Sequence, residues 1–86
     1  MKYIFLLPLV GRECCIEYLS NRFCGVVVKE TRNVIFLRHN LSGKIKKFPK
    51  QNIIIEVHDF NLRAHGKYFI GTPVQRLKKL YRMFRK

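Results

Sequence analysis

Apolar, β-branched stretches alternate with turn residues along most of this chain. Two strongly apolar runs, Gly25 to Glu30 and Val34 to His39, are rich in residues that fit a pleated sheet surface. The segment between them, Glu30 to Asn33, predicts a hairpin turn, because Asn tolerates the left-handed conformation and Thr bonds its neighbouring backbone. We therefore expect a β-hairpin near the centre of the chain.

Further strands are expected on both sides of this hairpin. The pattern predicts them at Cys14 to Leu19, Ile53 to Val57, Leu62 to His65 and Lys67 to Ile70, the last two joined through Gly66. A lysine-rich strand also follows the predicted turn Asn40 to Gly43. In that strand Ile45 and Phe48 lie three residues apart and cannot both face the core of a regular strand. We expect a β-bulge or bend near Lys46 and Lys47.

The end of the chain changes to a helical period. Thr72 and Pro73 predict the start of a helix in which Gln75 reaches back to the cap. Apolar residues then fall on one face and basic residues on the other: Val74, Leu77, Leu80, Tyr81 and Phe84 against Lys79, Arg82 and Lys86. Such a helix packs on the sheet beside a phosphate backbone, lies on a membrane, or is solvated. We favour the first, because a small domain gains stability by docking an apolar stripe.

Length and pattern together predict a single domain. A chain of 86 residues holds one small core. Five or more short strands with close turns favour a mainly β fold, a small, strongly bent antiparallel barrel of the Sm-like or SH3-like kind. We expect this barrel over residues 11–71 and a C-terminal amphipathic helix over residues 72–86. Both faces of the central hairpin are apolar, so one face is expected in the core and the other against a partner or a terminal element.

Charge narrows the choice of partner. Eighteen Lys and Arg against five Asp and Glu give a formal net charge of +13. Because such an excess repels itself, a polyanionic partner explains it better than a merely soluble basic protein does. The segment Lys2 to Val10 has the positive start of a signal peptide, but Pro8 interrupts it and it is too short to span a bilayer. We expect a protein that is not secreted and binds nucleic acid, not a membrane.

Cysteine and histidine offer little further chemistry. Cys14, Cys15 and Cys24 form an odd set without the C-x-x-C spacing of a zinc site, so we expect small buried thiols. The acidic and imidazole groups of Glu56 to Asp59 suggest a metal or nuclease site, but catalysis needs positioned partners that the sequence does not display. We expect a solvated rim there, with no catalytic residue, no metal site and no bound cofactor.

Three motifs, in order, resemble one known family. Gly25 to Asn33 (GVVVKETRN) is similar to the G-x-V-V-D-E-T-(K/R)-N signature of the ribonuclease P protein component 1 family. Gly43 to Lys50 (GKIKKFPK) resembles its G-K-x-K-x-(I/V)-P-K motif. Ile70 to Pro73, with Arg76 to Lys79 after it, resembles the L-x-G-R-P-E-D-R-(I/L)-K-K ending. The resemblance covers Gly11 to roughly Leu80, which is nearly the whole chain.

The resemblance implies the Sm-like protein subunit of archaeal and eukaryotic ribonuclease P, in which the RNA cleaves precursor tRNA to release mature 5′ ends. It implies a non-catalytic role, with ribonuclease P RNA, precursor tRNA and a zinc-ribbon protein subunit as partners. Mg²⁺ is expected on the RNA component, and whether ribonuclease MRP shares the subunit stays open. The location would be cytoplasmic in an archaeon and nuclear or nucleolar in a eukaryote.

The chain departs from the family pattern at a few positions. Lys29 replaces the usual Asp, Thr72 replaces Arg, and Val74-Gln75 replaces Glu-Asp, so each change removes acid or exchanges one local contact for another. The expected RNA contacts are basic residues in the turns, the lysine-rich strand and the helix: Arg12, Arg32, Lys44, Lys46, Lys47, Lys50, Arg76, Lys79 and Arg82. A ribosomal or nucleoid-associated structural protein and a membrane-active cationic protein are the alternatives, and an independent enzyme is the weakest.

Overall fold

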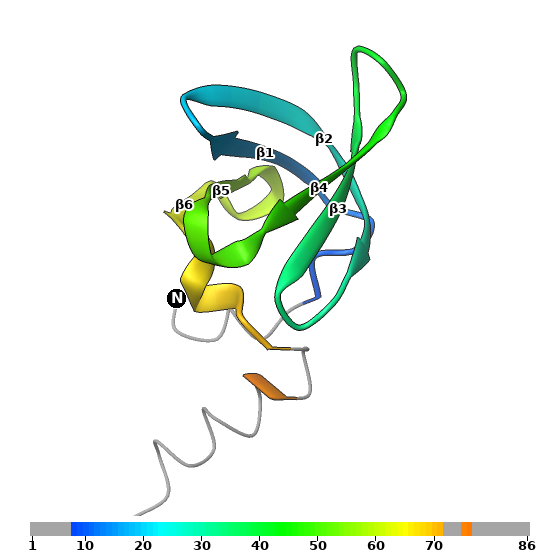
Figure 1. Cartoon of the computed structure of the whole chain (residues 1–86). Helices are drawn as coiled ribbons and strands as arrows, with labels where there is room; N and C mark the ends of the chain where they lie inside the picture. Colours follow the sequence, from blue (N-terminus) through cyan, green and yellow to red (C-terminus); the bar gives the residue numbers. More distant parts are fainter. Residues whose placement is uncertain (1–7, 72–74, 77–86) are drawn as a thin grey trace, which may run out of the picture.

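One antiparallel sheet makes up most of the protein (Figure 1). The structure, a computed structural model, describes residues 8–71 and 75–76. Its strands are β1 (Glu13–Tyr18), β2 (Asn21–Glu30), β3 (Val34–His39), β4 (Ile45–Pro49), β5 (Ile54–Val57) and β6 (Leu62–His65). Short 3₁₀ helices follow β4, β5 and β6: η2 (Lys50–Asn52), η3 (His58–Phe60) and η4 (Gly66–Phe69). The expectation of a mainly β, antiparallel fold is confirmed.

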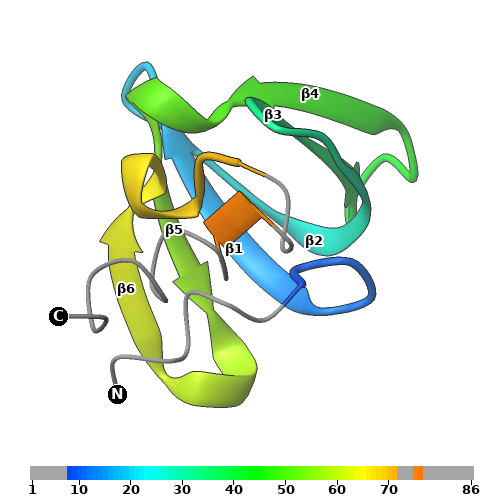
Figure 2. The same cartoon turned by 90° about the horizontal axis from the view of Figure 1, so that it is seen from below.

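The strands are ordered β4-β3-β2-β1-β5-β6 across the sheet. The first four form a meander, and β5 and β6 extend the sheet beyond β1. The sheet bends without closing into a barrel, because no strand ladder joins β4 to β6 in the described part of the chain. Instead η2 and η4 lie side by side (Figures 1 and 2), and the Gly66 amide donates to the Ile53 carbonyl at 2.8 Å. Gly66 permits this approach, since an added Cβ would lie 2.1 Å from the Lys50 carbonyl oxygen.

The β1–β2 turn was not evident from the sequence. Its central residues, Leu19 and Ser20, have φ of 51° and 67°, which is the left-handed conformation at both positions of a two-residue hairpin. Such turns usually carry Asn or Gly, and this one carries neither at its centre. As a result β2 begins at Asn21, and its residues from Asn21 to Val26 pair with the whole of β1, whereas the sequence predicted a strand only from Gly25.

A β-bulge lies in β2, not in β4 where the sequence placed it. Val27 pairs with Leu37 and Lys29 pairs with Phe36, so Val28 is the extra residue. The bulge turns Lys29 to the outer face and Glu30 to the core side, opposite Ile35. The prediction for β4 is therefore wrong: that strand pairs regularly with β3, and Ile45 simply points outward with 59% exposure.

Apolar side chains on the concave side of the sheet form one core. Its buried members come from every strand except β6, together with flanking segments: Leu9, Cys14, Ile16, Val27, Ile35, Leu37, Phe48, Ile53, Ile55, Val57 and Phe69. Phe69 enters this core from η4, where the sequence predicted a strand from Lys67 to Ile70. That prediction is wrong, because His65 accepts a hydrogen bond from the Lys67 amide at 3.0 Å and caps a helical turn.

Cys15 and Cys24 are joined by a disulfide, so the expectation of three free thiols is wrong. The two residues are directly opposite each other in the β1–β2 ladder, with Cα atoms 4.0 Å apart. Cys14 remains a free, buried thiol. Burial, and secondarily the charge of Asp59, raises the pKa of the Cys14 thiol from 9.0 to about 12.

A buried ionic cluster ties the end of β2 to the segments after β4 and β6. We define the Glu30 cluster as Glu30, Lys50 and Arg76. The Glu30 side chain is 2% exposed, and its Oε1 accepts from Lys50 Nζ at 2.8 Å and from Arg76 Nη1 at 2.6 Å. Both cations also donate to the carbonyl oxygens of Phe69 and Gly71. Burial lowers the pKa of the Lys50 ammonium, and the hydrogen bond to Glu30 opposes that shift.

The expected C-terminal helix falls mostly outside the described residues. Gln75 and Arg76 have helical backbone, but residues 72–74 and 77–86, which carry the apolar stripe, are not among those the structure describes. The docking of that stripe stays a prediction. Within residues 8–71 and 75–76, no helix is long and apolar enough to span a bilayer.

Neutralising Glu30 should lower the free energy of unfolding far more than neutralising a surface carboxylate does. Glu30→Gln leaves Lys50 and Arg76 buried without their carboxylate, so we expect the free energy of unfolding to fall by about 3 to 5 kcal/mol in urea denaturation. Glu56→Gln is the matched control, because Glu56 also accepts from two cationic side chains, Arg22 and Arg63, but at the solvated surface. We expect its unfolding midpoint to stay near that of the parent. Equal losses in the two variants would contradict a special role for the buried cluster.

Cys14 should make the fold less stable at alkaline pH. Its pKa is about 12 in the folded protein and 9.0 in the unfolded chain, so above pH 9.0 the unfolded chain releases a proton that the folded protein keeps. Stability present below pH 9.0 is therefore lost as the pH rises toward 12. From about pH 8 to about pH 10, chemical denaturation of the parent should lose about 1 kcal/mol more than that of Cys14→Ala. Parallel pH profiles would show that this thiol does not contribute.

Candidate nucleic-acid interface

Every carboxylate side chain in this protein lies beside a basic side chain. The chain has five Asp and Glu residues, all within the described part. The pairs are Glu13 with His58, Glu17 with Arg63, Glu30 with Lys50 and Arg76, Glu56 with Arg22 and Arg63, and Asp59 with Arg12. Except for Glu30, these carboxylates belong to β1, β5 and η3, so acidic charge is confined to one half of the sheet and to the interior.

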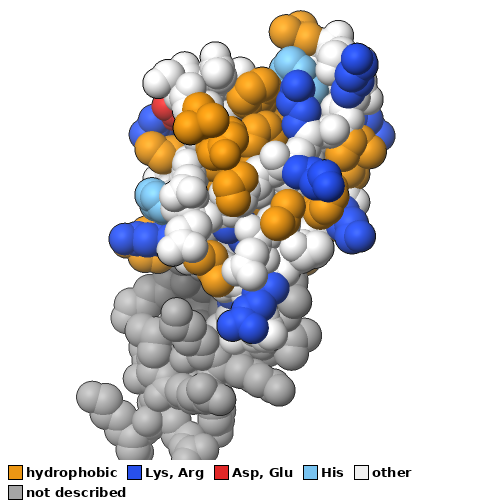
Figure 3. Space-filling view, viewed as in Figure 1, with side chains coloured by type: hydrophobic (Ala, Val, Ile, Leu, Met, Phe, Trp, Pro, Cys, Tyr) orange, Lys and Arg blue, Asp and Glu red, His pale blue; other side chains and the backbone are white. Residues whose placement is uncertain are grey.

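Apart from the buried Glu30, the other half of the sheet carries only positive charge. Lys and Arg side chains without a carboxylate partner among the described residues are Lys29, Arg32, Arg38, Lys44, Lys46, Lys47 and Lys67. All but Lys67 belong to β2, β3, β4 or the turns between them. Figure 3 shows Lys and Arg side chains along the side formed by β3 and β4, with almost no acidic side chain in view. This half of the protein therefore presents a positive field that no internal anion cancels.

An aromatic ring lies at the centre of this charge. Phe36 on β3 is opposite Lys29 on β2 and Lys47 on β4. The two ammonium nitrogens lie 5.3 Å and 5.9 Å from the centroid of its ring. Arg38, two residues along β3, points to the same outer side and is exposed. We name Lys29, Phe36, Arg38 and Lys47 the outer basic face; its cations and its ring can meet phosphates and bases respectively.

Several of the residues predicted to contact RNA lie where such contact is feasible. Lys47 belongs to the outer basic face, while Arg32 and Lys44 are exposed in the flanking turns. Lys46 is half-buried on the opposite side of β4, with its ammonium 5.4 Å from the Phe23 ring centroid. Arg12 is exposed in part, but its guanidinium is paired with Asp59 at 2.9 Å. Arg12 is thus a weaker candidate than the others.

Lys50 and Arg76 require a correction. The sequence placed both on the RNA-facing surface, but the Lys50 residue is 0% exposed and Arg76 is 5% exposed. Their charges are directed at Glu30 and at two backbone carbonyls, so they hold the fold together instead of facing a phosphate backbone. Lys79 and Arg82 lie outside the described residues, and their role stays a prediction.

Sequence reasoning missed Lys29, Phe36 and Arg38. Lys29 follows an apolar run in which simple alternation places it on the side of Val27, and only the bulge turns it outward beside Phe36. Arg38 alternates correctly with buried Leu37, so the strand pattern alone could have placed it on the outer side. The absence of acidic residues from Arg32 to Phe48 is a signal that could have found Phe36 and Arg38, but not Lys29, which precedes this range and is followed by Glu30.

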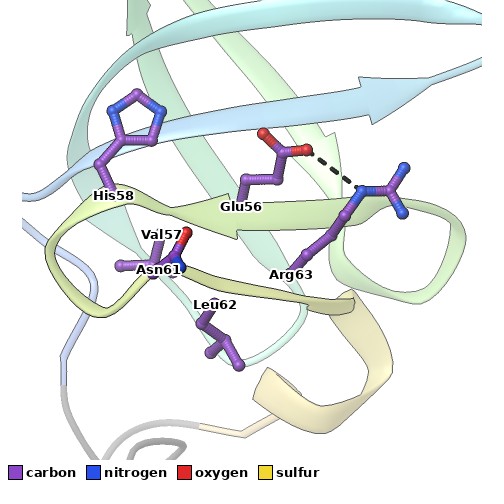
Figure 4. Close-up of a pocket in the computed structure, with 6 residues that line it drawn as sticks. All are labelled: Glu56, Val57, His58, Asn61, Leu62 and Arg63. Atoms are coloured by element: carbon purple, nitrogen blue, oxygen red, sulfur yellow. Dashed lines mark hydrogen bonds and ion pairs between the residues drawn. The ribbon is translucent and has the colours of Figure 1, made fainter.

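The suspected acidic site forms no metal centre in the described part of the chain. A shallow hollow of about 220 Å³ lies between β5 and β6, lined by Glu56, Val57, His58, Asn61, Leu62 and Arg63 (Figure 4). The Glu56 carboxylate is turned toward Arg63, and the hydrogen bond from Arg22 is the main cause of its lowered pKa. Within residues 8–71 and 75–76, no group of three His, Cys, Asp or Glu side chains could hold a metal ion.

Comparison with known proteins adds no assignment. Neither the family models nor the curated proteins searched contain a match to this chain. Functional inference for this protein therefore depends on its residues, their motifs and the geometry described above.

Removing the outer basic face should weaken RNA binding in a salt-dependent way. Changing Lys29, Arg38 and Lys47 together to Gln should flatten the plot of log affinity against log salt by about 2 on single-stranded RNA, because each neutralised phosphate contributes about 0.7. The matched control removes equal charge from the other half of the sheet, by changing Arg12, Arg22 and Arg63 to Gln. Fluorescence anisotropy across a salt series measures both slopes. Equal flattening in the two variants would show that net charge alone, and not this face, drives binding.

Proposed function

We propose that this protein binds RNA through its outer basic face and acts as a non-catalytic protein subunit of ribonuclease P. The observation that carries the RNA-binding proposal is the separation of charge. Acidic side chains are all paired, and unpaired cations gather on β2, β3 and β4 around an aromatic ring. A polyanion with flat bases satisfies both features of that face.

The three sequence motifs meet at one place, which supports the more specific assignment. Glu30 comes from GVVVKETRN, Lys50 ends GKIKKFPK, and Arg76 follows IGTP. Lys50 and Arg76 are 20 and 46 residues from Glu30 along the chain, yet both donate to the same oxygen of its carboxylate. Residues that must neutralise one another inside a fold are expected to occur together. Their joint presence therefore favours the ribonuclease P protein component 1 family over a chance likeness.

Other motif residues also have a structural reason to be what they are. Gly25 lies so close to β3 that an added Cβ would be 1.9 Å from the Arg38 carbonyl oxygen. Gly71 has φ of 99°, a conformation that favours glycine, and its amide donates to the Arg32 carbonyl at 2.7 Å. The meander with β5 beside β1 is compatible with the strongly bent, Sm-like or SH3-like architecture that we propose, with the C-terminal amphipathic helix as its final element.

A division of labour follows from this assignment. The RNA component would cleave precursor tRNA and bind the Mg²⁺, while this protein would supply fixed cations that reduce repulsion between phosphates. The carboxylates nearest the hollow are hydrogen-bonded to guanidinium groups, which favours a structural role for them over metal-assisted hydrolysis. In this proposal the protein partner is the zinc-ribbon subunit, and the location is cytoplasmic in an archaeon or nuclear in a eukaryote.

The RNA that the protein binds in cells tests this assignment. We expect RNA crosslinked to the protein to be enriched in ribonuclease P RNA and precursor tRNA, and enrichment should fall when Lys29, Arg38 and Lys47 are changed to Gln. Purified protein without RNA should not cleave precursor tRNA, whereas added to the RNA component it should lower the Mg²⁺ concentration required for cleavage.

Other crosslinking results point to other functions. Enrichment of ribosomal RNA would favour a ribosomal protein, and recovery of DNA would favour a nucleoid-associated one. Cleavage by RNA-free protein that disappears when Glu56, His58 and Asp59 are changed together would contradict the non-catalytic role. The variant with Arg12, Arg22 and Arg63 changed to Gln controls for loss of net charge in each measurement.

A further inference from the structure

An aromatic cluster lies at one end of the core, on the side opposite the outer basic face. Four strands each contribute one inward-facing residue there: Tyr18 from β1, Phe23 from β2, His39 from β3 and Lys46 from β4. We name these residues the mouth cluster. Phe23 pairs with buried Ile16, and Lys46 pairs with buried Leu37. Tyr18 and His39 lie two residues beyond these same core positions. The cluster therefore forms the last layer of the core.

The rings of this cluster rest on Phe48 and on one another. The Phe23 ring lies 5.2 Å from that of Phe48 and 5.6 Å from that of His39, and the Tyr18 ring meets Phe48 edge-on at 5.8 Å. Tyr18, Phe23 and His39 are each half-buried, so part of every ring is open to solvent. Contact with the buried Phe48 holds the rings of Tyr18 and Phe23 in place before any ligand arrives, and the Phe23 ring in turn contacts that of His39.

The mouth cluster lies between two turns. The β1–β2 and β3–β4 turns lie at the same end of the molecule (Figure 1), and hydrophobic side chains gather on this end with Lys and Arg side chains beside them (Figure 3). The turns carry the exposed apolar residues Leu19 and Leu41. Half-buried rings at the end of a β-structure are typical of sites that bind a planar ligand.

The charge around the mouth cluster is positive. The Lys46 ammonium lies 5.4 Å from the centroid of the Phe23 ring, and Lys44 is exposed in the adjoining turn. Neither lysine has a carboxylate partner in the described part of the chain. A ligand that combines planar rings with negative charge therefore fits better than a purely apolar peptide does, since an apolar peptide would leave these cations uncompensated.

We propose that the mouth cluster stacks one or two unpaired nucleobases while Lys46 and Lys44 contact the adjoining phosphates. The inference rests on the proposed RNA-binding function and adds to it a preference for single strands. Duplex bases are stacked on each other and unavailable to the rings of Tyr18 and Phe23, whereas unpaired bases of a loop or bulge can stack on these rings. Lys46 then moves from the Phe23 ring to a phosphate as a base takes its place.

The test separates bases from phosphates. The full-length protein is titrated with an adenylate oligomer of about eight nucleotides and with an abasic oligomer of the same length. We expect the parent to bind the base-bearing oligomer about tenfold more tightly, since each stacked base adds measurably to affinity. The Tyr18→Leu, Phe23→Leu double variant should lose most of this preference, with the abasic oligomer bound as tightly as by the parent.

Phe60→Leu is the matched control for loss of a half-buried ring. Arg12 lies over Phe60 at 4.6 Å, so this pair resembles Lys46 over Phe23 but lies beside η3, and its Arg is paired with Asp59. The preference for bases should survive in this variant. Phe36→Leu tests the outer basic face in the same way. We expect a smaller loss of the preference than in the double variant, and a larger loss would move base stacking to the outer basic face and overturn the proposal.

The remaining outcomes are also decisive. Equal binding of both oligomers by the parent would overturn base stacking but would leave the proposed RNA binding intact. This result is expected if the mouth cluster binds a protein instead of a nucleobase. If the parent binds neither oligomer, the proposed function fails and this inference fails with it. Should circular dichroism show the double variant unfolded, Tyr18→Leu alone carries the test: a reduced preference for bases supports the proposal, and an unchanged preference overturns it.

Discussion

The rest of this structure depends on the interactions of one group, the carboxylate of Glu30. It is buried at the end of β2, where it binds Lys50 from η2, Arg76 from the segment after η4, and the amide of Leu9. Because a buried ion without partners is far more costly than a paired one, these distant segments must assemble together or not at all. The cluster thereby holds η2 and η4 beside each other and substitutes for the missing strand ladder between β4 and β6.

The β-bulge at Val28 makes that arrangement feasible and sets the charge of the surface. By shifting the register it directs Glu30 inward and Lys29 outward to Phe36. The interior therefore receives one carboxylate and two cations, and the outer side of β2, β3 and β4 receives none of the acidic residues. One irregularity in a strand thus accounts for both the buried cluster that stabilises the fold and the outer basic face proposed to bind RNA.

The two proposed RNA-contacting surfaces lie on opposite sides of the same strands and meet at β4. Lys46 and Lys47 are neighbours in sequence, yet Lys46 belongs to the mouth cluster and Lys47 to the outer basic face, because side chains alternate along a strand. Edge strand β4 thus offers a phosphate contact on each of its sides, with Phe23 behind one lysine and Phe36 behind the other. An RNA chain following this edge would meet cations continuously and rings at two places.

The sequence alone determined the local features: most strands, the central hairpin, the excess of positive charge and the positions of the three motifs. These follow from periodicity and composition, which neighbouring residues define among themselves. Only the tertiary structure decided which charges are buried, because Lys50 and Arg76 look like surface cations until Glu30 is placed 20 and 46 residues away. It likewise decided the disulfide, since Cys15 faces Cys24 only across the Leu19-Ser20 turn, and the outward direction of Lys29, since a bulge is defined by the partner strand and not by its own residues.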